Sequence, residues 1–147
     1  MNPDRLLDTH CHVASYADPV AILGAADRAG VGIVAVTENP DEYRRLRTRL
    51  GHREHVQVAL GLHPLRAASF GPNDLARFFR FVPQTGWIGE VGLDYSRAGA
   101  ATAKVQQRIF DVVLSEAQPG RHPLTVHSRG AEKDVIERLA EGNYSGP

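Results

Sequence analysis

Short apolar segments alternate along this chain with segments of helical pattern, and this alternation limits the fold more than any other feature of the sequence. Five segments have the length and composition of buried strands: 6–12, 31–36, 56–62, 87–93 and 124–127. Each precedes a segment whose apolar residues recur at helical spacing: 19–29, 40–50, 73–82, 102–117 and 131–140. Strands that alternate with helices predict a parallel sheet with right-handed crossovers, so we expect an α/β fold that binds ligands at the carboxyl ends of its strands.

Residues that start and stop helices support this division. Asp18-Pro19 and Asn39-Pro40 each combine a capping side chain with a proline in the first turn. Glycine follows each of the first two helices, where it commonly ends a helix. On the third helix we expect four apolar residues to face inward: Leu75, Phe78, Phe79 and Val82.

The charge balance gives no reason to expect a protein that coats nucleic acid. Lysine and arginine together number 17, and so do aspartate and glutamate, so the net charge is zero. Five arginines nevertheless lie close together: Arg44, Arg45, Arg47, Arg49 and Arg53. We interpret this run as the solvent-facing surface of the second helix rather than as a contact for nucleic-acid backbone. His52, His55 and His122 have no partner pattern, and we expect them at the surface.

The cellular setting expected from composition is reducing and aqueous. Cys11 is the only cysteine, so no disulfide can form within the chain, and its alternation with the flanking histidines predicts that it packs inward. No apolar run approaches the roughly 20 residues that span a bilayer. We therefore expect a cytoplasmic protein without a membrane partner.

Two histidines end the first predicted strand. Side chains alternate along a strand, so Asp8, His10 and His12 share one face. Two imidazoles at this spacing can bind one divalent metal ion. The alternative is a pair of solvated histidines at the start of a loop.

The fourth predicted strand carries two acids on one face, Glu90 and Asp94. An acid in an apolar strand is costly to bury unless it is paired or bound to a metal. The alternative to a metal ligand here is a salt bridge to an arginine. Gly92, between the two acids, marks the close approach of a ligand or of another backbone.

Histidines also follow two further strands. His127 ends the fifth strand, and Arg129, two positions later, could contact an anionic ligand. His63 follows the third strand and is either a ligand contact or a turn residue. Together, the strand ends hold the residue types of a hydrolytic site with one or two metal ions.

With these residues identified, the chain resembles the TatD family of metal-dependent deoxyribonucleases, within the amidohydrolase-like superfamily. The resemblance rests on Asp8-Thr9-His10-Cys11-His12, Gly61-Leu62-His63-Pro64, the segment 88–95, His127-Ser128-Arg129 and the region of Gln106, Gln107 and Phe110. These motifs occur in the family's order across almost the whole chain.

The resemblance implies a TIM-type (β/α)₈ barrel, of which residues 1–147 would form one domain, the N-terminal part, with about five βα units. It implies that two divalent metal ions, Mg or Zn, are held by His10, His12, Glu90 and His127, with Glu90 catalytic and bridging. His63, Asp94 and Arg129 would surround the metals or contact substrate phosphates. The implied reaction is hydrolysis of DNA phosphodiesters, often from the 3′ end.

One departure from the family leaves alternatives open. The family pattern continues with a histidine on the sixth strand and an aspartate on the eighth, and these 147 residues end before either. The chain alone is therefore expected to be incomplete for catalysis. Two other functions remain: hydrolysis of a small molecule, or a non-catalytic truncated barrel that binds metal, itself or a partner chain along its open sheet edge.

Overall fold

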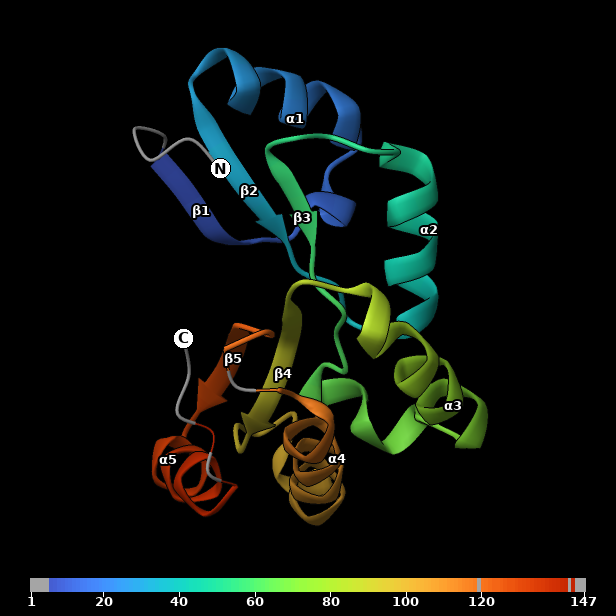
Figure 1. The fold of residues 1–147 in the computed structure, drawn as a ribbon. Helices are drawn as coiled ribbons and strands as arrows, with labels where there is room; N and C mark the ends of the chain where they lie inside the picture. The colour runs from blue at the N-terminus through green and yellow to red at the C-terminus, as the bar shows by residue number, and fades with distance from the viewer. Residues whose placement is uncertain (1–5, 119, 143, 145–147) are drawn as a thin grey trace.

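A computed structural model describes residues 6–118, 120–142 and 144 of the chain. Strands and α-helices alternate throughout this part, as the sequence predicts (Figure 1). In chain order they are β1 Leu6–Cys11, α1 Pro19–Arg28, β2 Val31–Ala35, α2 Pro40–Leu50, β3 Val56–Val58, α3 Pro72–Phe81, β4 Ile88–Asp94, α4 Ala103–Glu116, β5 Leu124–Arg129 and α5 Glu132–Glu141. None of the helices in these residues is long and apolar enough to cross a membrane.

The strands form two parallel sheets, one in the order β1-β2-β3 and one of β4 and β5. Figure 1 shows the first sheet and the second as separate parts of the molecule, with α1 and α2 beside the first and α3, α4 and α5 around the second. A single parallel bridge, between Leu60 and Ile88, joins β4 to the segment that follows β3. The order of the strands in space is therefore their order along the chain.

Thr37 connects the two sheets just beyond the end of β2. Its backbone N–H donates to the Gly89 carbonyl at 3.2 Å, and its carbonyl accepts from the Glu90 N–H at 3.0 Å. Its hydroxyl donates to the Ala59 carbonyl at 2.8 Å and accepts from the Gly61 N–H at 3.1 Å. A Cβ at Gly61 would lie 1.6 Å from the Thr37 carbonyl oxygen, so only glycine allows this crossing of strands.

The first two helices begin at the caps that the sequence predicts. The Asp18 carboxylate accepts from the N–H groups of Val20 and Ala21, and Pro19 is the first helical residue. The Asn39 side chain accepts from the Glu42 N–H, and Pro40 follows it. These bonds satisfy donors that have no partner within the helix and so fix where α1 and α2 start.

Buried apolar side chains fill the space between the sheets and their helices. The larger cluster includes Tyr43, Leu60, Phe78, Ile88, Leu93 and Phe110, and a second includes Val13, Leu23, Ile33 and Leu46. Cys11 is buried in the second cluster, as predicted. The apolar stripes read from the sequence are thus the faces that hold helix to sheet.

Three details differ from the sequence prediction. The third strand ends at Val58 rather than at residue 62, because Leu60 turns from β2 to pair with β4. Phe79 is 42% exposed, because it lies about 100° around α3 from the fully buried Phe78. His122 is fully buried rather than at the surface, and its Nδ1 accepts from the Gln118 N–H at 3.1 Å.

Candidate metal centre

The histidines and acids that the sequence places at strand ends meet around the carboxylate of Glu90. His10 lies near the end of β1, and His12 follows that strand directly. His63 comes after β3 and opens a short 3₁₀ helix, Pro64–Ser69. Glu90 is on β4, and His127 is on β5. Residues separated by up to 117 positions thus reach one point because parallel strands share an orientation.

Glu90 is the centre of the group. Its side chain is only 5% exposed, and its Oε2 lies 3.1 Å from His12 Nε2 and 3.5 Å from His10 Nε2. The His63 Nε2 is also 3.5 Å from the same oxygen. On the other side, Glu90 Oε1 is 2.6 Å from His127 Nδ1. The sequence left open a salt bridge between Glu90 and an arginine, but no arginine of the described residues pairs with it; four imidazoles surround this carboxylate instead.

The donor atoms fit a divalent cation. Two triads have ligand atoms within 4.8 Å of one another: His10, His12 and Glu90, and His63, Glu90 and His127. Glu90 Oε2 is buried and makes no hydrogen bond to any of the described residues, although three imidazole nitrogens lie 3.1–3.5 Å from it. A buried anionic oxygen without a partner is costly, and a cation among these nitrogens would remove that cost. Imidazole and carboxylate together are ligands for Zn²⁺ and related ions.

Asp94 contacts the nitrogen of the His127 ring that faces away from Glu90 and so orients this ring. Its Oδ2 is 2.9 Å from His127 Nε2, while His127 Nδ1 faces Glu90. Burial by itself would raise the pKa of Asp94, but hydrogen bonds from Ser96 and the contact with His127 outweigh it and hold the pKa below 3.8. When the Asp94 carboxylate accepts a hydrogen bond from the Nε2–H group, the Nδ1 lone pair of His127 is left for a metal, an arrangement common around metal-binding histidines.

His63 presents a donor rather than a lone pair to the centre. Its Nδ1 accepts from the Leu65 N–H at 3.2 Å, so the neutral ring carries its proton on Nε2, the atom that faces Glu90. Burial lowers the pKa of His63 below 6.5, against the opposing effect of Glu90, and this favours the neutral ring. Of the two triads, the one with His63 is therefore the poorer metal site.

Gly92 lets β4 and β5 approach closely beside the centre. Its φ is +131°, and a Cβ there would lie 2.2 Å from the His127 carbonyl oxygen. The close approach that the sequence predicts for this glycine is thus to a backbone, that of β5. This approach places His127 directly beside β4, the strand that carries Glu90.

The other residues predicted from the sequence have separate surroundings. Asp8 is exposed, and its carboxylate accepts from the His10 N–H at 3.0 Å. Arg129 ends β5, and its carbonyl accepts from the Tyr95 N–H at 2.8 Å. Within the described residues, no hydrogen bond or ion pair joins the Arg129 guanidinium to Glu90 or its histidines.

Two residues that the sequence motifs do not indicate, Thr37 and Glu38, also lie beside the centre. The Glu38 carbonyl accepts from the His63 N–H at 3.0 Å, and its carboxylate pairs with Arg66 at 3.0 Å. A signal was present in the sequence, because both residues directly follow the second strand. Neither residue belongs to a histidine motif, so their position at a strand end is the only sequence signal for them.

Comparison with known proteins gives a consistent result. The family model described as "TatD related DNase" matches residues 7–146. The human protein "Deoxyribonuclease TATDN3" is 30% identical over 155 residues, covering 92% of this chain and 56% of that protein. The Mycobacterium tuberculosis protein "Uncharacterized metal-dependent hydrolase TatD" is 32% identical over 150 residues, covering 93% and 57%. The chain therefore spans about half the length of the curated relatives it matches.

A solved structure shows the fold. The Escherichia coli TatD homologue YJJV superposes with a TM-score of 0.81 at 23% identity, covering 95% of this chain and 57% of that one. This confirms the expected incomplete barrel of βα units. With a family match over nearly all of its residues, this chain belongs to the family of TatD-related DNases.

Proposed function

We propose that this chain forms the N-terminal part of a single barrel domain that hydrolyses phosphodiester bonds in DNA with the help of divalent metal ions. The observation that carries the proposal is the buried Glu90 Oε2, which lacks a hydrogen-bond partner among three imidazole nitrogens. The relatives named as deoxyribonucleases and metal-dependent hydrolases support the reaction class. The proposal concerns the complete barrel, of which these residues supply the first five βα units.

Each histidine has a proposed role. His10, His12 and Glu90 would hold one cation, and His127 would hold a second that shares Glu90. Two ions, Mg or Zn, would offset negative charge on the attacking and leaving oxygens of the phosphodiester. Glu90 is the catalytic residue of this scheme because both ions would depend on its two oxygens.

Three further residues would act on the substrate or its surroundings. His63 would donate its Nε2 proton to a phosphate oxygen, consistent with its Nδ1 being occupied by Leu65. Asp94 would hold His127 in the orientation that exposes Nδ1. Arg129, at the carboxyl end of β5, would contact a second phosphate oxygen. We propose that cleavage proceeds from the 3′ end.

The free edges of the two sheets are proposed as a contact for further chain or a partner. Among the described strands, β1 pairs only with β2 and β5 only with β4. A hollow of about 480 Å³ lies between β1 and β5, lined in part by His10, Leu124 and Val126. An unpaired edge invites another strand. Light scattering of the purified chain checks for self-association at this face.

Two measurements test the proposed function. Calorimetric titration of this chain with Mn²⁺ and Zn²⁺ should show binding that Glu90→Gln abolishes. For a barrel that includes the remaining strands, single-stranded DNA labelled at either end should be shortened from the 3′ end only with metal present. Turnover of small esters or amides without turnover of DNA would overturn the substrate, and activity retained by Glu90→Ala would overturn the site.

A further inference from the structure

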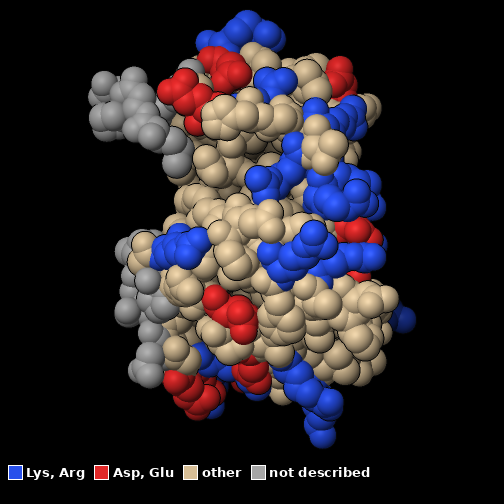
Figure 2. Space-filling view, turned by 45° about the vertical axis from the view of Figure 1, so that its right-hand side comes forward, with Lys and Arg blue, Asp and Glu red and all other residues tan. Residues whose placement is uncertain are grey.

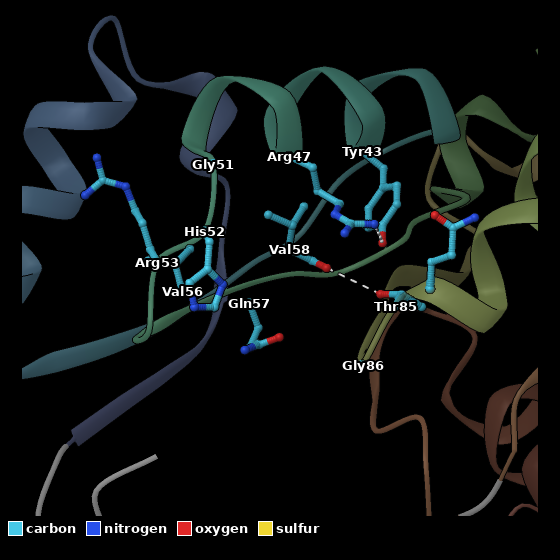
Figure 3. Close-up of a pocket in the computed structure, with 11 residues that line it drawn as sticks. Tyr43, Arg47, Gly51, His52, Arg53, Val56, Gln57, Val58, Thr85 and Gly86 are labelled. Atoms are coloured by element: carbon cyan, nitrogen blue, oxygen red, sulfur yellow. Dashed lines mark hydrogen bonds between the residues drawn. The ribbon is translucent and has the colours of Figure 1, made fainter.

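A basic groove lies beside the C-terminal half of α2, and none of the residues around Glu90 lines it. It consists of two adjoining hollows of about 240 and 340 Å³, which share Tyr43, Arg47 and Gln84. Arg53, Gln57 and Thr85 line the first hollow, and Arg44 and Thr48 line the second. We call these eight residues the arginine groove. Figure 3 shows Arg53 at one side of the first hollow and Arg47 at the other, beside Tyr43.

Three segments build the groove. One wall is the C-terminal half of α2, and the floor is the start of β3. The other wall is the turn from Gln84 to Gly86 before β4. The Thr85 hydroxyl donates to the Trp87 carbonyl at 2.8 Å, which fixes this turn against β4. The groove is thus a hollow formed by the fold and not only a row of side chains on a helix.

The charge of the groove is one-sided. None of the described residues that line either hollow is acidic. In the part of the chain that the structure describes, Arg47 hydrogen-bonds only to the Tyr43 hydroxyl, at 3.0 Å, and Arg53 Nε is buried without a partner. Arg44, the third arginine of the groove, lies 3.8 Å from the Asp41 carboxylate, whereas Arg66 and Arg77, outside the groove, each pair with a carboxylate at 3.0 Å. Figure 2 shows Lys and Arg gathered across the middle of this side of the molecule.

Helix electrostatics explain only part of this arrangement. A cation near the C-terminus of a helix is favoured by the helix dipole, which accounts for Arg47 in the last turn of α2. It does not account for Arg53, which lies beyond the helix, or for the absence of acids among the lining residues. As the sequence predicts, the arginines of α2 face solvent, and the structure adds that Arg44 and Arg47 also line a groove.

We propose that the arginine groove binds the phosphate backbone of a nucleic-acid strand, as a second contact remote from the metal centre. Guanidinium groups bind phosphate oxygens in pairs, and the amides of Gln57 and Gln84 add neutral donors. Two hollows in a row, with an arginine in each and Arg47 shared between them, suit successive phosphates better than one small anion. The inference rests on the proposed function for the choice of nucleic acid as the polyanion.

Binding without metal tests the groove separately from the centre. The probe is a fluorescent 20-nucleotide single-stranded DNA, and its anisotropy is measured in EDTA as salt is varied. Replacing Arg47 and Arg53 together by Gln should weaken binding several-fold at low salt and reduce the slope of log K against log salt by about 1.4, two phosphate contacts at about 0.7 each. Arg108→Gln, an exposed arginine on α4, is the matched control and should leave both unchanged.

Further variants separate the outcomes. Replacing Arg47 and Arg53 together by Lys keeps the positive charge and should retain most of the salt slope. This variant shows whether weaker binding by the double Gln variant comes from lost charge or from a folding defect. The measurement is made in EDTA, so a failed metal centre leaves this result intact. Equal affinity of wild type and the Gln pair would overturn the proposal. If dAMP displaces the oligonucleotide and binds with the same affinity, the proposal is also overturned, in favour of a small phosphorylated ligand.

Discussion

Gln106 holds both backbone polar groups of Asp94. Its Oε1 accepts from the Asp94 N–H at 2.7 Å, and its Nε2 donates to the Asp94 carbonyl at 3.0 Å. The same Nε2 contacts the Gly99 carbonyl and the Thr102 hydroxyl, both at 2.9 Å. Because the Asp94 carboxylate in turn contacts His127, Gln106 sets the position of a proposed metal ligand that it does not touch.

Replacing Gln106 by Leu is expected to destabilise the fold. The side chain is fully buried, so its loss leaves the Asp94 N–H and carbonyl without partners, at about 1–3 kcal/mol for each unsatisfied group. Urea unfolding of the variant measures this cost. Gln118→Leu, at an exposed position, is the control and should change stability by less than about 0.5 kcal/mol. A Gln106 variant as stable as this control would contradict the role.

Glu90→Gln is expected to remove stabilisation by metal. A ligand that binds only the folded state raises its stability, by about 2.7 kcal/mol at 100 times the dissociation constant. The wild-type melting temperature should therefore rise with added Zn²⁺ or Mn²⁺, while that of the variant should not, because Glu90 belongs to both candidate triads. Glu137→Gln on α5 is the control and should respond like the wild type. An equal rise in Glu90→Gln would exclude Glu90 as a ligand.

Gly92→Ala is expected to lower the free energy of unfolding by about 3 kcal/mol or more, because the variant combines a strained backbone with overpacking. The new Cβ would lie 2.2 Å from the His127 carbonyl oxygen, at a φ of +131°. Gly30→Ala is the matched control, since Gly30 has a φ of +73° but nothing within 4 Å of its Cβ position. That control should cost about 1–2 kcal/mol, the conformational penalty alone. Similar losses in both variants, measured by urea unfolding, would show that the approach of β5 is unimportant.

Acid should destabilise the fold through His122. Burial lowers the pKa of His122 below its ordinary 6.5, with a smaller contribution from Arg121. Below pH 6.5 the unfolded chain therefore binds a proton that the folded chain does not, so stability is complete above that pH and declines as pH falls toward the folded pKa. His122→Asn should flatten the slope of unfolding free energy against pH by up to about 1.4 kcal/mol per pH unit. His63 shifts in the same direction, so some slope should remain. An unchanged slope would contradict this account.

The sequence predicts the order and type of the elements because each carries its own local signal. Asp18-Pro19 and Asn39-Pro40 start helices through bonds within four residues, and such bonds do not depend on the rest of the fold. The end of β3 could not be predicted, because it depends on Leu60 pairing with Ile88, 28 positions away. His122 was misplaced for a related reason, since its burial follows from the packing of the turn after α4 rather than from neighbouring residues.

The sequence likewise predicts only part of the candidate centre. Alternation along strands and the shared direction of parallel strands were enough to bring His10, His12, Glu90 and His127 together. They could not show which nitrogen of a ring faces inward. The Leu65 N–H occupies Nδ1 of His63, and Asp94 lies at Nε2 of His127, and both facts need side-chain positions.

The junction between the two sheets has a consequence for motion. Among the described residues, backbone bonds around Thr37, Leu60 and Glu90 join the two sheets, and the centre draws His10 and His12 from the first sheet and Glu90 and His127 from the second. A metal ion bound there would have ligands from both sheets and would therefore hold them together. We therefore expect hydrogen exchange at the amides of β1 and of β4 to slow together when metal is added.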